Sequence, residues 1–189
     1  IKGIQLNEIN IKFIKWVSDY TLAPIGLVLK LFTINKDIIS YERVDKTLSE
    51  ATFKSTILND EQDKAKEEII KIQKNSNKPV VLEGVTGSGK TEVYFDLIEQ
   101  EIDQSKQILI MVPEISLTPQ FENRFRERFG MEINIWHSKI TPKRRKEIWH
   151  KCYAGEPIVV IGARSSLFLP FSNLGLTIID EEHDASYKQ

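Results

Sequence analysis

A glycine-rich stretch followed by a lysine and a threonine has the residue types and the spacing that hold a polyphosphate. It contains Gly84, Gly89, Lys90 and Thr91 and so matches the pattern G-x-x-x-x-G-K-[ST] at every fixed position. Backbone N–H groups of such a loop and of the helix that follows it converge on one point and favour an anion there. We therefore expect the phosphates of ATP to bind residues Gly84, Val85, Thr86, Gly87, Ser88, Gly89, Lys90 and Thr91.

A second group of chemically active residues, Asp180-Glu181-Glu182-His183, comes directly after a mostly apolar run. A carboxylate at the tip of a strand can hold Mg²⁺, so we predict that Asp180 and the Thr91 hydroxyl are its ligands. Lys90 would contact the β- and γ-phosphates, and Glu181 would orient and deprotonate the attacking water. The alternatives are a glycine turn with an exposed lysine and a solvated acidic turn.

These two groups need a scaffold that brings them together, and the apolar pattern predicts one. A short β-branched strand over 79–82 precedes the loop, and a helix over 90–102 follows it. Four more strands are predicted at 107–112, 133–136, 157–161 and 174–179, with helices starting near Thr118 and Thr141. Five strands joined by long crossovers predict an α/β fold whose parallel sheet is covered by helices on both faces. Ligands then bind at the carboxyl ends of the strands.

The N-terminal part is predicted to be helical. Amphipathic helices are expected over 7–20 and from Ala23-Pro24 to Phe32, with a short strand near Ile38. This segment, residues 1–45, is either part of a small winged-helix-like DNA-binding module or a helical cap on the main domain. Polar residues 46–58 are the expected linker, and the main domain is 59–189. Its first helix begins after Asn59, with Ala65, Ile69 and Ile72 facing inward.

Composition narrows the class of protein. A net charge of −1 gives no bulk attraction to nucleic acid, so any such binding must come from a local patch. The single cysteine, Cys152, excludes an internal disulfide and favours a reducing compartment. No apolar run is long enough to span a bilayer, so we expect a cytoplasmic protein without a membrane partner. The chain starts without methionine and stops nine residues after Asp180, so we expect it to be part of a longer protein.

Three longer segments closely resemble the PriA family of replication-restart helicases, also called primosomal protein N′. They are Gly-Val-Thr-Gly-Ser-Gly-Lys-Thr-Glu-Val-Tyr (84–94), Val-Pro-Glu-Ile-Ser-Leu-Thr-Pro-Gln (112–120) and Asp-Glu-Glu-His-Asp-Ala-Ser-Tyr-Lys-Gln (180–189). The likeness covers 59–189 strongly and 20–30, in the family's winged-helix region, more weakly. It implies most of a first RecA-like lobe of a superfamily 2 helicase that moves 3′ to 5′ with Mg²⁺ and ATP. It also implies the family's partners, which are single-stranded and forked DNA, other primosome proteins and single-stranded-DNA-binding protein.

The resemblance also implies residue roles. Gln62 belongs to the segment that recognises adenine, His183 couples the nucleotide site to DNA, and Tyr187 opens an aromatic-rich loop that senses DNA. The single-stranded DNA path is expected along Pro113, Glu114, Thr118, Arg164 and Ser165. In the full-length family a second lobe supplies an arginine finger and an insertion binds zinc. Because both lie outside these residues, this chain is expected to bind ATP with little turnover and to hold no zinc.

Two other functions are alternatives to the helicase. One is a nucleotide-dependent switch that changes affinity for DNA or a protein without motor activity, and Glu181→Gln discriminates between them. The other is a small-molecule kinase, which has no use for the acidic cluster with its histidine. The basic run Lys143–Lys146 beside Trp149 is better interpreted as a solvated helix face than as a DNA contact.

Overall fold

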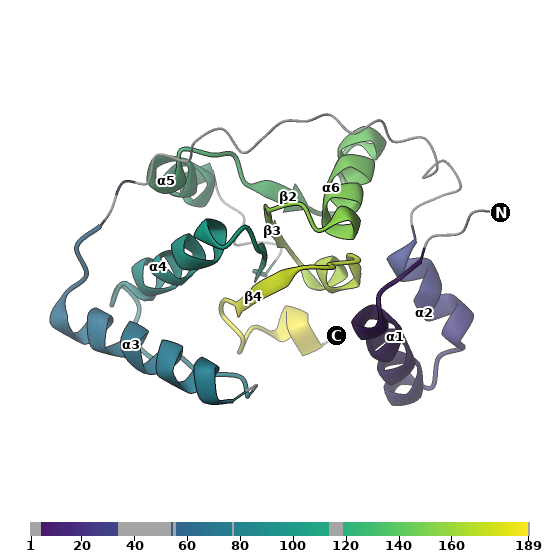
Figure 1. Cartoon of the computed structure of the whole chain (residues 1–189), viewed down its shortest axis with the longest axis horizontal. Helices are drawn as coiled ribbons and strands as arrows, with labels where there is room; N and C mark the ends of the chain where they lie inside the picture. The colour runs from purple at the N-terminus through teal and green to yellow at the C-terminus, as the bar shows by residue number, and fades with distance from the viewer. Residues whose placement is uncertain (1–4, 34–53, 55, 77, 114–118, 189) are drawn as a thin grey trace.

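A parallel four-stranded sheet lies at the centre of the molecule. The computed structural model describes residues 5–33, 54, 56–76, 78–113 and 119–188. The strand order is β2-β3-β1-β4, and every neighbouring pair is parallel (Figure 1). The strands are β1 (Gln107–Met111), β2 (Asn134–Trp136), β3 (Ile158–Gly162) and β4 (Leu174–Ile179).

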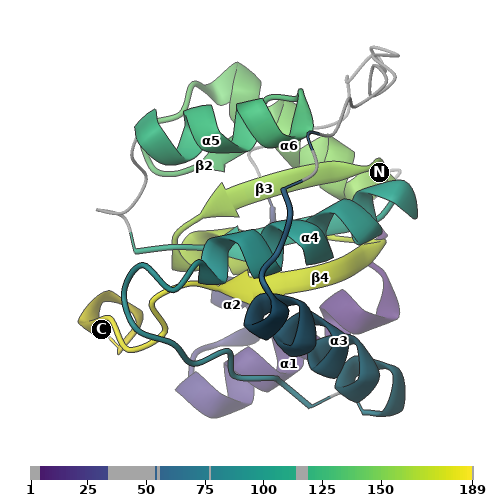
Figure 2. The same ribbon diagram turned by 90° about the vertical axis from the view of Figure 1, so that its left-hand side faces the viewer.

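Helices cover both faces of this sheet, as predicted. Figures 1 and 2 show α3 (Asp60–Asn75), α4 (Lys90–Asp103) and α5 (Pro119–Phe129) on one side. The other side carries α6 (Pro142–Ala154), with α1 (Glu8–Thr21) and α2 (Ile25–Phe32) beyond it. These bounds agree with the predicted helices to within a few residues. Thr141 caps α6 by accepting from the backbone N–H of Arg144, and Pro142 begins the helix, also as predicted.

Strand β1 is buried along its whole length because it has a neighbour on each side and helices above and below. Ile108 and Ile110 face α4 and α5, whereas Leu109 and Met111 face α6. Phe125 and Phe129 of α5 join the first of these clusters, which confirms that the phenylalanine stripe is core. Phe95 of α4 is not among the residues predicted to face inward. Its side chain is completely buried and packs against Phe125 and Phe129.

The fifth predicted strand, 79–82, is absent from the sheet that the described residues form. Within the described residues, no backbone hydrogen bond joins this segment to another strand, and β4 pairs only with β1. Val80 and Leu82 pack on the core while Val81 is 80% exposed. Buried and exposed side chains therefore alternate along this segment, as they do in a strand. A strand also requires a hydrogen-bonded neighbour, and the local sequence pattern does not show whether one is present. The inward orientation predicted for Ile72 is also wrong, because its side chain is exposed.

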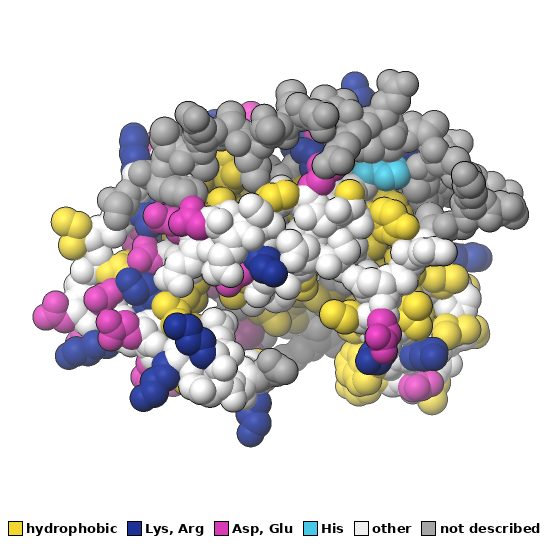
Figure 3. Space-filling view, in the orientation of Figure 1, with side chains coloured by type: hydrophobic (Ala, Val, Ile, Leu, Met, Phe, Trp, Pro, Cys, Tyr) yellow, Lys and Arg dark blue, Asp and Glu magenta, His cyan; other side chains and the backbone are white. Residues whose placement is uncertain are grey.

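The two N-terminal helices pack against the main domain. Phe13 and Phe32 contact Phe168, and the indole N–H of Trp149 donates to the Phe32 carbonyl oxygen at 2.7 Å. Asn10 on α1 also donates to the Phe171 carbonyl oxygen. Their outer surface is unusually apolar for exposed helices (Figure 3), with exposed side chains at Ile9, Ile11, Trp16, Tyr20, Leu22, Ile25, Leu27, Leu29 and Leu31.

Other predictions fall on residues that are not described. The strand near Ile38 and most of the linker 46–58 lie outside the described ranges, so the proposed division at 45 and 58 stays a prediction. Among the helices that are described, none combines the length and apolarity required to cross a bilayer.

Candidate functional site

The phosphate loop is built as its sequence predicts. Gly87 and Gly89 both have φ +82°, which lies in the left-handed region that side chains rarely adopt. Gly89 caps α4, so the first N–H groups of the helix face the loop without a capping side chain. The Lys90 ammonium lies over the loop and donates to the carbonyl oxygens of Gly84 at 2.5 Å and Val85 at 3.2 Å. The loop thus gathers a cation and several N–H donors at one point, as polyphosphate binding requires.

Gln62 lies directly against this loop. Its backbone N–H donates to the Asn59 side chain at 2.9 Å, and its own side-chain oxygen accepts from the Asn59 N–H at 3.0 Å, a complete capping box. The remaining amide nitrogen donates to the Ser88 carbonyl oxygen at 3.1 Å. A Cβ at Gly89 would lie 2.2 Å from that nitrogen, so the glycine also makes room for Gln62. This position fits a residue at the nucleotide, and the contact with adenine itself stays a prediction.

Asp180 meets the phosphate-loop helix through Tyr94. The Tyr94 hydroxyl donates to Asp180 Oδ2 at 3.2 Å, and Thr91 lies three residues before Tyr94 on α4, so the two side chains share one face of the helix. Burial raises the pKa of Tyr94 well above its ordinary value, and the charge of Asp180 raises it further. Tyr94 therefore links the helix that carries Thr91 to Asp180, the other predicted Mg²⁺ ligand. A carboxylate and an alcohol oxygen are hard oxygen donors of the kind that Mg²⁺ prefers, so the residues present fit this ion.

The loop after β4 carries the other acidic-cluster residues. Glu181 is exposed and has φ +50°, an uncommon conformation for a residue other than glycine and one often found at functional sites. His183 is also exposed. The Tyr187 hydroxyl donates to the Asp180 carbonyl oxygen at 3.1 Å, and burial, with the charge of Asp180, raises the pKa of Tyr187 to about 12. Tyr187 therefore holds the backbone of the loop after β4 through this hydrogen bond.

The described residues among those predicted to line the DNA path, Pro113, Arg164 and Ser165, follow strands that end at the same edge of the sheet as Asp180. Met111 is paired with both Gly162 and Ile179, so β1, β3 and β4 end side by side. Arg164 and Ser165 follow β3 in a short 3-10 helix, η3 (Arg164–Phe168), and both are exposed. Pro113 follows β1 and is buried. Two other predicted DNA-path residues lie outside the described residues, Glu114 and Thr118.

The basic run at the start of α6 is mostly occupied by contacts within the chain. Arg144 donates to Glu147 at 2.9 Å and to the Asn134 side chain at 2.8 Å. Arg145 donates to the His137 carbonyl oxygen, and its guanidinium lies 5.0 Å from the centre of the Trp136 ring. These contacts favour the solvated structural face over a DNA contact.

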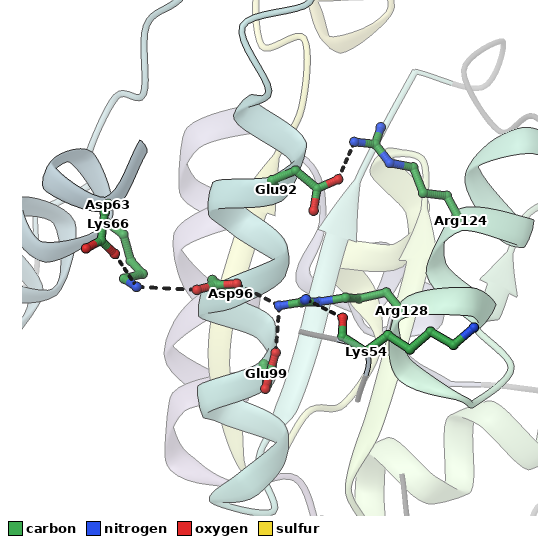
Figure 4. A network of polar contacts seen from close by, with 8 residues as sticks. All are labelled: Lys54, Asp63, Lys66, Glu92, Asp96, Glu99, Arg124 and Arg128. Atoms are coloured by element: carbon green, nitrogen blue, oxygen red, sulfur yellow. Dashed lines mark hydrogen bonds and ion pairs between the residues drawn. The ribbon is translucent and has the colours of Figure 1, made fainter. Parts of the chain in front are cut away.

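Ion pairs hold the three helices around the loop together (Figure 4). Arg128 on α5 is 4% exposed and pairs with Asp96 and Glu99 on α4, both at 2.7 Å. Asp96 also pairs with Lys66 on α3 at 3.4 Å, one helical turn after Gln62. The Arg128 guanidinium also donates to the backbone oxygen of Lys54. α3, which carries Gln62, is thereby tied to the phosphate-loop helix.

Tyr94 is the site residue that sequence reasoning missed. Its position on the apolar face of 90–102 predicted only core packing. The signal that could have found it is chemical, because a buried tyrosine hydroxyl needs a polar partner. That partner is 86 positions away in the sequence, on another element.

Comparison with known proteins agrees with this geometry. Residues 59–189 match the model of the DEAD/DEAH box helicase family, and the chain belongs to that family. Its sheet and helices form the family's α/β, RecA-like lobe.

Individual relatives are similar to this chain over different shares of its length. The chain is 48% identical to replication restart protein PriA of Rickettsia felis over 95% of this chain and 27% of that protein. It is 45% identical to the Bacillus subtilis protein of the same name over 79% of this chain and 19% of the relative. It is 53% identical to the Haemophilus influenzae protein over 58% of this chain and 15% of the relative. The chain spans about a quarter of the length of the relative from Rickettsia felis.

Proposed function

We propose that this chain is the ATP-binding lobe of a cytoplasmic 3′–5′ DNA helicase that restarts replication at stalled forks. The observation that carries the proposal is the hydrogen bond to Asp180 from Tyr94, which lies one turn after Thr91 on the phosphate-loop helix. The matches to proteins named replication restart protein PriA support the biological role. The expected partners are single-stranded and forked DNA, other primosome proteins and single-stranded-DNA-binding protein.

The chemistry follows from the residues at the loop. Lys90 and the N-terminus of α4 bind and orient the β- and γ-phosphates, while Thr91 and Asp180 hold Mg²⁺. Mg²⁺ held by these two residues would neutralise charge that develops on the phosphates. Glu181 is exposed beside Asp180, where its carboxylate takes the proton of the attacking water. Gln62 provides selectivity for adenine from the outer side of the loop.

Motor activity also needs residues outside this chain, in a protein of the same length as the relatives. A transition-state arginine from another lobe is worth about 10³–10⁵ in rate, so the 189-residue chain should bind ATP but turn it over very slowly. DNA would pass along the exposed Arg164 and Ser165, while His183 and Tyr187 would report its presence to the nucleotide site.

The test uses a chimera in which this chain replaces the matching segment of the Rickettsia felis relative. Steady-state ATP hydrolysis is measured with and without single-stranded DNA, and Glu181→Gln is the matched variant. A helicase lobe predicts DNA-stimulated hydrolysis that Glu181→Gln abolishes while nucleotide binding persists. Hydrolysis indifferent to both DNA and the substitution would contradict the proposal and favour a nucleotide-dependent switch.

A further inference from the structure

Tyr94 is placed to control one oxygen of the Asp180 carboxylate. The tyrosine is 6% exposed and lies on α4, one turn after Thr91, where its hydroxyl donates to Asp180 Oδ2 at 3.2 Å. We propose that Tyr94 is a positioning residue that keeps this carboxylate directed at the Thr91 hydroxyl, so that Mg²⁺ joins the bound nucleotide at low concentration. The inference rests on the proposed function, because it concerns the metal of that nucleotide site.

Among the described residues, the other hydrogen bonds of Asp180 do not involve Oδ2. Oδ1 accepts from the Glu181 N–H at 3.0 Å. The backbone is held separately, since the Asp180 N–H donates to the Met111 carbonyl oxygen at 2.9 Å and the Asp180 carbonyl oxygen accepts from Tyr187. Removing the Tyr94 hydroxyl would therefore leave the main chain of Asp180 in place. The carboxylate would be held only by the bond from the Glu181 N–H to Oδ1, and so it would rotate more freely.

Packing gives the ring of Tyr94 a second and separable role. Its ring packs edge-on against Phe95 with centroids 5.4 Å apart, and it belongs to the core cluster between α4 and the sheet. Phenylalanine has the same ring and fills the same space. Tyr94→Phe therefore removes the hydrogen bond to Asp180 while keeping the packing that positions α4.

The size of the expected effect follows from metal sites in general. Groups that orient a metal ligand without touching the metal typically change its affinity by about 10–100-fold when they are removed. We expect Tyr94→Phe to raise the Mg²⁺ concentration needed for half-maximal nucleotide binding by about tenfold. Nucleotide binding without Mg²⁺ depends on the loop and Lys90, so it should change by less than about twofold, a difference below 0.5 kcal/mol.

The experiment titrates Mg²⁺ into the 189-residue chain with a fluorescent, non-hydrolysable ATP analogue and follows binding by fluorescence anisotropy. A parallel nucleotide titration in EDTA measures metal-free binding. Tyr20→Phe is the matched control, because Tyr20 is 76% exposed on α1 and far from the acidic cluster in sequence. It should reproduce the wild-type curves. In the Asp180→Asn background Tyr94→Phe should have no further effect, because both changes act through the same carboxylate.

Three outcomes would overturn the inference, and they are distinguishable. If the wild-type chain shows no Mg²⁺-dependent binding, the proposed function fails together with it. If the wild type depends on Mg²⁺ and Tyr94→Phe gives the same Mg²⁺ midpoint, the function stands and the positioning role is wrong. If Tyr94→Phe weakens binding equally in EDTA and in Mg²⁺, the tyrosine acts on the shape of the loop instead of on Asp180.

Discussion

Two apolar runs with similar sequences, Val80-Val81-Leu82 and Ile108-Leu109-Ile110, adopt different structures in this molecule. The second becomes the central strand β1, with strands on both sides and all its residues buried. The first leads into the phosphate loop, and within the described residues it is held by the packing of Val80 and Leu82 and not by a ladder. The sheet around β1 therefore stabilises this lobe, whereas the segment that leads into the phosphate loop serves nucleotide binding.

Amide hydrogen exchange should give the largest contrast between the two runs. Exchange of the β1 amides requires global unfolding, whereas the amides of 80–83 need only a local opening. For a domain stabilised by about 5 kcal/mol, the β1 amides should exchange roughly 10³-fold or more slowly. Mass spectrometry of peptides that cover the two segments measures this ratio. Equal protection would mean that 80–83 is part of the sheet in solution.

Large-to-small substitutions should change the free energy of unfolding more in β1 than in residues 80–82. Ile110→Ala opens a cavity in a fully buried position of β1 and should cost about 2–5 kcal/mol. Val81→Ala removes an 80% exposed side chain and should change stability by about 0.5 kcal/mol or less. Urea unfolding followed by circular dichroism compares the two variants. A Val81→Ala cost approaching that of Ile110→Ala would contradict the structural assignment of this segment.

Two of the arginines of α5, Arg124 and Arg128, extend the contrast to charges. Arg128 is buried against Asp96 and Glu99, so Arg128→Met would remove the cation beside Glu99 and leave Asp96 with only the longer pair to Lys66 (Figure 4). Breaking a buried pair costs about 3–5 kcal/mol, and the partial exposure of both carboxylates lowers our expectation to about 2–4 kcal/mol. Arg124 pairs with Glu92 but is 49% exposed, so Arg124→Met should cost about 0–1 kcal/mol.

Arg124→Met is thus the matched control for Arg128→Met on the same helix. Thermal unfolding of both variants at low and high salt provides the measurement. The cost of Arg124→Met should shrink further with salt, because an exposed pair is screened. Equal costs for the two substitutions would mean that burial does not decide the value of these ion pairs.

The sequence allowed most of the lobe to be predicted, for reasons visible in particular residues. Phosphate binding depends on fixed chemistry at adjacent positions, so Gly84 to Thr91 could be read directly. Helices such as α6 have local capping signals, here Thr141 and Pro142. The features that the sequence did not predict depend on long-range contacts. No local pattern shows that 79–82 lacks a strand partner among the described residues, or that Tyr94 contacts Asp180.

The smallest effect on stability is expected at the residue with the largest role in binding. Lys90 donates to two carbonyl oxygens of an exposed loop, and water can replace such bonds, so Lys90→Ala should change the unfolding free energy by about 0.5 kcal/mol or less. The same substitution removes the cation that faces the phosphates, so binding of the fluorescent ATP analogue should be lost. Lys78→Ala, which removes an equal charge from an exposed position six residues before Gly84, should affect neither property. A large loss of stability in Lys90→Ala would mean that the loop, and not only the sheet and the ion pairs of α4, holds this lobe together.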